Sequence, residues 1–187
     1  MKHQIYGNEL KNMPYEPRPE GCDSPLWRYS KNPVISMNPF PNASRVFNSA
    51  VMAYKGEFIG VFRADTKNGI PFLFVGHSKD GIKFDFEEKP IVFHDKNGKA
   101  IKLEYAYDPR LVELEGYYYI IFCTSMHGPT LGVGKTKDFK DFELIDNPFL
   151  PFNRNGVLFP RKINGMYAMF SRPSDSGQTQ LGDIFLS

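Results

Sequence analysis

A turn glycine followed by an aromatic strand occurs three times in this chain, and this repeat limits the possible folds more than any other feature. The copies begin at Gly56, Gly116 and Gly165. In the first two copies a further strand follows, and then a motif of hydroxyl, Lys and Asp residues closed by Phe, at residues 78–84 and 136–142. The repeat length is close to that of one β-propeller blade. Short strands, frequent turns and the lack of a helical period therefore predict an all-β fold.

The third copy of the repeat is shorter than the other two. It reaches a strand near residues 182–186, and the chain ends before a third hydroxyl-Lys-Asp motif. Because a ring of blades must close to remove its edge strands, we interpret the chain as roughly the first two and a half blades of a longer propeller. The alternative is a small complete β domain whose repeats reflect only hairpin turn chemistry. Strands are expected near residues 47–54, 58–64, 72–77, 90–93, 109–114, 117–123, 131–135, 157–163, 166–171 and 182–186.

Residues 1–30 differ in character from the repeats. They are rich in Pro, Asn and charged residues, and their prolines interrupt any regular element. We expect an extended N-terminal arm that lies over its own propeller or over a neighbouring subunit. Residues 31–187 are then the partial propeller, with blades 1 and 2 and the start of blade 3. The arm and the unpaired edge strand together favour a homo-oligomer.

The overall composition argues against several classes of function. Of 187 residues, 23 are basic and 21 acidic, and the net charge of +2 gives no electrostatic reason to expect nucleic acid or a membrane surface as a partner. Two cysteines are too few for a disulfide framework, and no apolar stretch has the length of a signal-peptide core or a membrane span. A cytoplasmic protein is therefore expected. His77, His94 and His127 lack metal-ligand spacing, so no metal site is predicted.

One aspartate and two arginines suggest acid catalysis and anion binding. Asp108 lies among aromatic residues and before Pro109-Arg110, and Arg154 and Arg172 follow in a later repeat. An isolated carboxyl among aromatic side chains can be held protonated until it gives its proton to a leaving group. Two arginines can bind an oxyanion such as phosphate through forked hydrogen bonds. Together they predict a glycosyl phosphorylase, whereas the structural alternatives are an Asx-Pro turn and surface salt bridges.

Several longer motifs match a known family in the expected order, at residues 47–50, 60–65, 107–110, 151–162 and 171–177. Through them the chain, from about Asn32 to its end, resembles the mannoside phosphorylases of glycoside hydrolase family 130. The resemblance implies a five-bladed β-propeller with its sugar site at the mouth of the central channel. Members of that family are considerably longer, which agrees with the interpretation of this chain as the N-terminal part of a propeller.

The resemblance also implies roles for individual residues. Asp108 matches the general acid, which in this family is thought to pass its proton through the 3-hydroxyl of the bound mannose to the glycosidic oxygen. The residues that match phosphate ligands are Arg154, Asn155 and Arg172, and those that match the mannose subsite are Asn48, Ser49, Arg63 and Asp65. The structural alternative for the last two is a mutual pair that stabilises the first blade. Inorganic phosphate is the implied co-substrate, and no cofactor is expected.

The functional expectation is inverting phosphorolysis of a β-mannoside, with β-1,4-mannosyl-glucose as the leading substrate, to give α-mannose 1-phosphate and a free sugar. Such a glycosyltransferase-type phosphorylase needs no carboxylate base, because phosphate is itself the nucleophile. One alternative is a β-mannoside hydrolase of the same fold, although hydrolytic relatives tend to replace the basic phosphate cluster with carboxylates. The other is a non-catalytic propeller fragment that binds carbohydrate or has a structural role.

Overall fold

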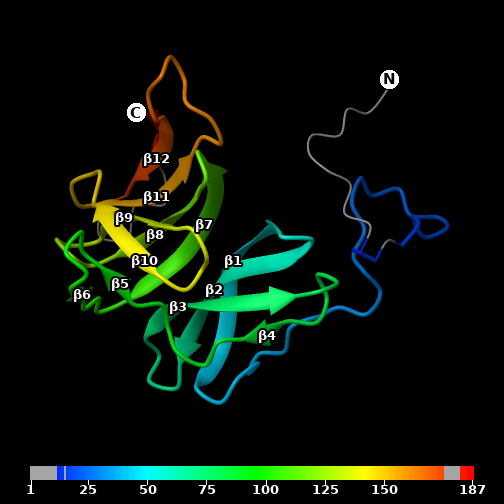
Figure 1. Cartoon of the computed structure of the whole chain (residues 1–187). Helices are drawn as coiled ribbons and strands as arrows, with labels where there is room; N and C mark the ends of the chain where they lie inside the picture. The colour runs from blue at the N-terminus through cyan, green and yellow to red at the C-terminus, as the bar shows by residue number, and fades with distance from the viewer. Residues whose placement is uncertain (1–11, 15, 175–181) are drawn as a thin grey trace.

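The computed structural model describes residues 12–14, 16–174 and 182–187, and these residues form an all-β chain (Figure 1). Its strands are β1 (Ala43–Tyr54), β2 (Glu57–Thr66), β3 (Pro71–Ser78), β4 (Asp85–Phe86), β5 (Phe93–His94), β6 (Ala100–Ile101), β7 (Ala106–Leu114), β8 (Tyr117–Thr124), β9 (Thr130–Thr136), β10 (Phe142–Asp146), β11 (Asn153–Leu158), β12 (Met169–Pro173) and β13 (Phe185–Leu186). Among the described residues there is no helix long and apolar enough to cross a membrane.

The strands form three consecutive antiparallel units, in the order that the repeats predict. The first unit is β1 to β4, the second is β7 to β10, and the third is β11 to β13. The repeat glycines Gly56, Gly116 and Gly165 lie in the hairpin turns with φ of 83°, 77° and 79°, a backbone conformation that glycine adopts without strain. The sequence repeat therefore corresponds to a structural repeat, as expected for propeller blades.

A shared apolar core fixes the first unit against the second. Its buried side chains come from both sheets and from the segment between them: Ile59, Val61, Leu73, Val75, Phe93, Ala106, Ile120, Phe122, Phe139, Phe142 and Leu144. Phe93 stacks on Phe122 with ring centroids 4.8 Å apart, and a side chain at Gly134 would collide with the Phe93 ring. Close packing of this kind resists displacement of one sheet relative to the other. The core thus sets the relative position of β2 and β7.

Strand positions differ from expectation mainly in the third unit. The strands expected at residues 157–163 and 166–171 lie instead at Asn153–Leu158 and Met169–Pro173. Pro160 has no backbone N–H to donate to a neighbouring strand, which ends the pairing early. Beyond it, Ile163 and Met166 pair with each other across a tight turn. Of the strand expected at residues 90–93, only Phe93 belongs to a strand of the structure. The short strands β4, β6 and β10 were not expected.

The two hydroxyl-Lys-Asp motifs form the same turn, after β3 and after β9. The hydroxyl oxygens of Ser78 and Thr136 each accept a hydrogen bond at 2.9 Å from the backbone N–H three residues later. The carboxylates of Asp80 and Asp138 each accept two backbone N–H groups, at 2.9 to 3.1 Å. Side-chain acceptors of this type stabilise tight turns by replacing backbone partners. The motif therefore encodes a structural turn in both units.

Asp138→Ala is expected to lower the free energy of unfolding by about 1 kcal/mol and Tm by about 2–4 °C, because two backbone N–H groups lose a charged acceptor at an exposed turn. Those N–H donors hold the pKa of Asp138 below its ordinary value of 3.8. The contribution is therefore present above that value and lost as the pH falls through the lowered pKa. Thermal unfolding over a pH series measures both effects. Asp141→Ala, at an exposed neighbour, is the control, and an equal loss in both variants would contradict the assignment.

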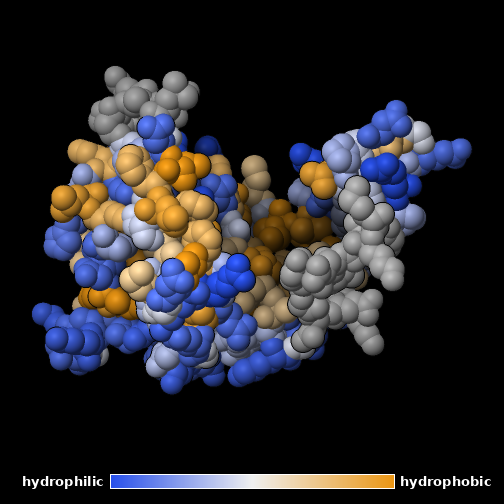
Figure 2. Space-filling model, turned by 90° about the horizontal axis from the view of Figure 1, so that it is seen from above, coloured by the Kyte–Doolittle hydropathy of each residue, from blue (hydrophilic) through white to orange (hydrophobic). Residues whose placement is uncertain are grey.

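The N-terminal segment stands beside the first unit and contains no strand in residues 12–14 and 16–42 (Figure 1). Its contacts are partly internal, since the Glu16 carboxylate accepts the N–H and the hydroxyl of Ser30 at 2.7 and 2.6 Å. Figure 2 shows an apolar hollow between this segment and the first unit, about 570 Å³ in volume. Phe40 already packs on Phe74, with centroids 4.7 Å apart, so the first unit begins before β1. The boundary at residue 30 stays a prediction.

Candidate active site

The residues predicted for the site lie at one end of the sheets. The strand registers define a row of opposed residues across the second and third units: Ala106, Thr124, Thr130, Asn153 and Pro173. Asp108, Arg154 and Arg172 each lie within two residues of this row. Arg63 and Asp65 lie near the end of β2 and reach the same region from the first unit. The fold therefore collects, from all three units, most of the residues that sequence motifs had singled out.

Asp108 has an unusual backbone conformation. Its φ is 53°, in the left-handed region that residues other than glycine seldom adopt. It lies inside β7, not in the Asx-Pro turn weighed as an alternative, at a β-bulge between Tyr107 and Arg110. Arg110 Nη1 donates to the Asp108 carbonyl at 3.0 Å and so supports the bulge. Bulges redirect side chains, and such backbone outliers occur preferentially at functional sites.

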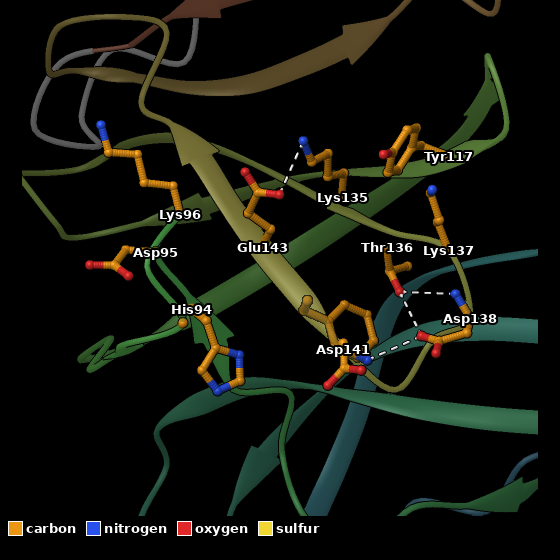
Figure 3. Close-up of a pocket in the computed structure, with 12 residues that line it drawn as sticks. His94, Asp95, Lys96, Tyr117, Lys135, Thr136, Lys137, Asp138, Asp141 and Glu143 are labelled. Atoms are coloured by element: carbon orange, nitrogen blue, oxygen red, sulfur yellow. Dashed lines mark hydrogen bonds and ion pairs between the residues drawn. The ribbon is translucent and has the colours of Figure 1, made fainter.

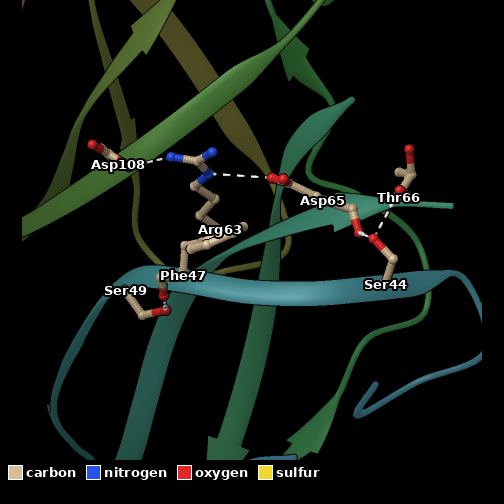
Figure 4. Close-up of polar contacts among 7 residues, drawn as sticks. All are labelled: Ser44, Phe47, Ser49, Arg63, Asp65, Thr66 and Asp108. Carbon is tan, nitrogen blue, oxygen red and sulfur yellow. Dashed lines mark hydrogen bonds and ion pairs between the residues drawn. The ribbon is translucent and has the colours of Figure 1, made fainter. Parts of the chain in front are cut away.

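Arg63 binds the Asp108 carboxylate across the boundary between the first and second units (Figure 4). Arg63 Nη1 donates to Asp108 Oδ1 at 2.9 Å, and Arg63 Nε donates to Asp65 Oδ1 at 3.3 Å. The three side chains are between 16% and 22% exposed, so both ion pairs are partly shielded from solvent. The pair of Arg63 with Asp65 was anticipated as the structural alternative. The expectation of an isolated carboxyl at position 108 was wrong, because Arg63 contacts it directly.

Two aromatic rings also contact the Arg63 guanidinium. Arg63 Cζ is 4.6 Å from the ring centroid of Phe47 on β1 and 5.1 Å from that of Tyr107 on β7. Both distances lie within the range of cation–π contacts. Sequence reasoning gave neither ring this role. The one available signal is that each directly precedes a predicted site residue, Asn48 and Asp108.

The three residues predicted to bind phosphate are neighbours on β11 and β12. Asn155 and Arg172 oppose each other in the register, and Arg154 occupies the irregularity between Asn153 and Asn155. All three are partly buried, which separates the two arginines from freely solvated surface residues. The fold thus confirms that these residues lie together, while their role in phosphate binding stays a prediction.

The positive charge of Arg154 affects the pKa of groups in the second unit. Burial raises the pKa of three groups on or next to β7 and β8, and the positive charge of Arg154 opposes that rise in each: Tyr105, Tyr107 and Cys123. The Asp108 charge acts on Cys123 as well, in the opposite direction to Arg154. The two candidate site residues therefore influence one common group, Cys123, which is fully buried.

Asn48 and Ser49 lie at a second bulge, where β1 changes register against β2 between Val46 and Ser49. Both residues are exposed, and the Ser49 hydroxyl donates to the Phe47 carbonyl at 2.8 Å (Figure 4). Among the described residues, no hydrogen bond joins either of them to Asp108. Ser49 also lines the apolar hollow beside the N-terminal segment, and the role of Asn48 and Ser49 in a mannose subsite stays a prediction.

Two buried polar residues at the same strand ends were not predicted from the sequence. Thr124 Oγ1 and Asn153 Oδ1 have no hydrogen-bond partner among the described residues, although Asn153 Nδ2 donates to Ser171 at 3.1 Å. Buried polar atoms are normally paired. A signal existed only for Thr124, which is a polar residue at the end of the apolar strand β8. They make this end of the sheets more polar inside than the rest of the core.

Lys162 is directed away from the candidate site. Its Nζ lies 2.8 Å from Glu115 Oε1, and the Tyr167 hydroxyl donates to the same carboxylate at 3.1 Å. Hydrogen bonds from Lys162 and Tyr167 lower the pKa of Glu115. Burial raises the pKa of Tyr119 to about 12, and its hydroxyl is 3.1 Å from that of Tyr167. These contacts join the hairpin tips of the second and third units at the end opposite to Asp108.

A separate depression of about 590 Å³ lies along β10 (Figure 3). Charged side chains of both signs line it, and two of its lysines contact other lining residues: Lys135 Nζ is 3.1 Å from Glu143, and Lys137 Nζ is 4.6 Å from the Tyr117 ring centroid. It contains none of the residues predicted for the site. In the part of the chain that the structure describes, no three His, Cys, Asp or Glu side chains gather in a way that could hold a metal ion.

Known proteins are similar to this chain over most or all of its length. A family model described as beta-1,4-mannooligosaccharide phosphorylase matches residues 8–187. A beta-1,4-mannooligosaccharide phosphorylase of Ruminococcus albus is 47% identical over 195 residues, which cover 100% of this chain and 58% of that relative. A 4-O-beta-D-mannosyl-D-glucose phosphorylase of Bacteroides fragilis is 30% identical over 169 residues, covering 80% of this chain and 42% of that relative. The chain therefore spans about half the length of these curated relatives.

The same fold occurs in a solved structure. The beta-1,2-mannobiose phosphorylase of Listeria innocua, in complex with beta-1,2-mannobiose, superposes with a TM-score of 0.68 at 22% sequence identity. The superposition covers 86% of this chain and 61% of the other. This likeness confirms the predicted fold class.

Proposed function

Because this chain belongs to glycoside hydrolase family 130, we propose that the protein catalyses phosphorolysis of a β-1,4-linked mannoside, with inorganic phosphate as co-substrate. The observation that carries the proposal is the arrangement at the strand ends. The Asp108 carboxyl lies at the same end of adjoining units as Arg154, Asn155 and Arg172. A phosphorolytic site needs a proton donor for the leaving group and donors that hold phosphate, and it needs no second carboxylate.

In the proposed reaction, a phosphate oxygen attacks C1 of the mannosyl unit from the face opposite to the leaving sugar. The bond from C1 to the glycosidic oxygen breaks, and that oxygen receives the proton supplied by Asp108, so the products are α-mannose 1-phosphate and a free sugar. Arg63 Nη1 contacts Asp108 Oδ1, so we assign the proton transfer to the other carboxyl oxygen, Oδ2. Arg154 and Arg172 each offer a planar fork of N–H donors that matches two phosphate oxygens.

The identity of the leaving sugar is the more specific part of the proposal. The relative that is 47% identical is named as a mannooligosaccharide phosphorylase, and the one that is 30% identical as a mannosyl-glucose phosphorylase. We favour β-1,4-mannooligosaccharides over the β-1,4-mannosyl-glucose expected at first, because the former relative matches all of this chain. The two substrates share the mannosyl unit that Asn48, Ser49, Arg63 and Asp65 are proposed to bind, so their discrimination depends on contacts with the leaving sugar.

The proposal predicts phosphate-dependent release of mannose 1-phosphate. We would incubate the protein, at a measured oligomeric state, with β-1,4-mannobiose and separately with β-1,4-mannosyl-glucose, each with and without phosphate, and separate the products chromatographically. The Ruminococcus albus relative serves as the active control. Product that requires phosphate supports the proposal, and the preferred disaccharide identifies the leaving sugar. Free mannose formed without phosphate would establish the hydrolase alternative instead.

A further inference from the structure

The contacts of Arg63 form a cluster that spans the first and second units (Figure 4). Phe47 and Arg63 belong to β1 and β2, whereas Tyr107 and Asp108 belong to β7. The guanidinium lies 2.9 Å from Asp108 and within 5.1 Å of both ring centroids. We propose that Phe47 and Tyr107 are positioning residues: their rings immobilise Arg63, which in turn fixes the Asp108 carboxyl for proton transfer. The catalytic part of this inference rests on the proposed phosphorolysis.

Arg63 needs such restraint because its hydrogen bonds alone leave it freedom to move. An arginine side chain loses much of its rotamer freedom when it is held in one place. Its bond to Asp65 is long, at 3.3 Å, and the side chain is 22% exposed. Planar rings close to a guanidinium restrict its rotation and favour one orientation of its donors. The rings therefore supply the restraint that a single short ion pair with Asp108 does not.

The backbone places both rings at irregular points of their strands. Phe47 lies in the β1 bulge, and its carbonyl accepts the Ser49 hydroxyl at 2.8 Å. Tyr107 opens the β7 bulge at which Asp108 takes a φ of 53°. A regular strand directs alternate side chains to opposite faces, and a bulge changes that alternation locally. One bulge in each unit thus brings an aromatic ring onto the same guanidinium.

Tyr107 makes a second contact that must be separated from the first. Its hydroxyl interacts with the thiol of Cys123, which is fully buried on β8. A change that removes the ring also removes this interaction. Tyr107→Phe keeps the ring face and removes only the hydroxyl, and Phe47→Tyr keeps the other ring. These two ring-retaining variants separate positioning through Arg63 from a general structural role.

Kinetics of the variants test the inference in the presence of the proposed activity. Phe47→Leu and Tyr107→Leu are each expected to lower kcat by about tenfold, in line with the loss of a cation–π contact, with the KM for phosphate unchanged. The ring-retaining variants are expected to keep the original kcat. Phe185→Leu, at a ring that is 51% exposed on β13, is the matched control. Unchanged kcat in the leucine variants, or an equal loss in Tyr107→Phe, overturns the inference.

A second measurement does not depend on activity. In nitrogen-15 NMR spectra, the Nε–H signal of Arg63 is assigned by its disappearance in Arg63→Lys, and its solvent exchange is measured in each variant. Slow exchange that becomes fast in the leucine variants, but not in the ring-retaining ones, supports immobilisation by the rings. Exchange that is equally slow in all variants overturns it.

If phosphorolysis is absent from the unmodified protein, the proposed function fails, while this measurement still decides the structural inference. Phe47 is 43% exposed, so its leucine variant is expected to fold.

Discussion

Asp108→Asn is expected to abolish phosphorolysis of β-1,4-mannosides, with a loss in kcat of at least about 100-fold, while mannoside binding is retained. The amide has nearly the same shape as the carboxyl, and its oxygen can still accept the Arg63 Nη1 hydrogen bond, which is 2.9 Å long in the unmodified protein. What the variant loses is the acidic proton that the leaving sugar requires. Initial rates of mannose 1-phosphate release, together with mannoside binding by calorimetry, measure the two quantities separately.

The control for this variant is Asp141→Asn, which removes an exposed carboxylate at the turn after β9. It is expected to leave the rate unchanged. Thermal unfolding of both variants shows whether each is folded. The bulge at Asp108 is expected to persist in Asp108→Asn, because φ of 53° is as accessible to Asn as to Asp. Turnover by folded Asp108→Asn at the original rate would remove Asp108 from the role of general acid.

The units of the fold were predictable because their signals are local. Gly56 and Gly116 each open a hairpin, and the hydroxyl-Lys-Asp motifs each close a turn with the same hydrogen bonds. Such turns depend on a few consecutive residues, so the sequence repeat shows them directly. The third unit was less predictable. Its first strand starts at Asn153, in a polar stretch of Asn and Arg whose low strand propensity is overridden by pairing with β12.

The contacts of the site were less accessible to sequence reasoning because they join distant residues. Arg63 and Asp108 are 45 positions apart and meet only because the shared core places β2 beside β7. Motifs identified both residues but not their ion pair. The contribution of Phe47 depends on a bulge, and a bulge shifts the alternation from which side-chain directions are predicted. Residue identity was therefore easier to predict than mutual geometry.

Replacing either arginine of the candidate phosphate site is expected to raise the KM for phosphate. Arg154→Ala and Arg172→Ala each remove a charge-assisted contact worth about 1.5–3 kcal/mol, which corresponds to an increase of roughly 10- to 100-fold. The KM for the mannoside is expected to change little, because the mannose subsite is proposed to lie at Arg63 and Asp65. Initial rates over a matrix of phosphate and mannoside concentrations give both constants.

The selectivity of this effect distinguishes phosphate binding from a structural role of the arginines. Arg161→Ala is the matched control, because Arg161 is an exposed arginine of the same β11–β12 hairpin. It is expected to leave both KM values unchanged. Arg172→Lys adds a second test, since lysine keeps the charge but lacks the planar fork, and we expect it to recover only part of the phosphate affinity. A variant that lowers stability without a change in phosphate KM would instead assign Arg154 and Arg172 to the packing of β11 against β12. The candidate site would then lack the phosphate-binding residues that a phosphorylase requires.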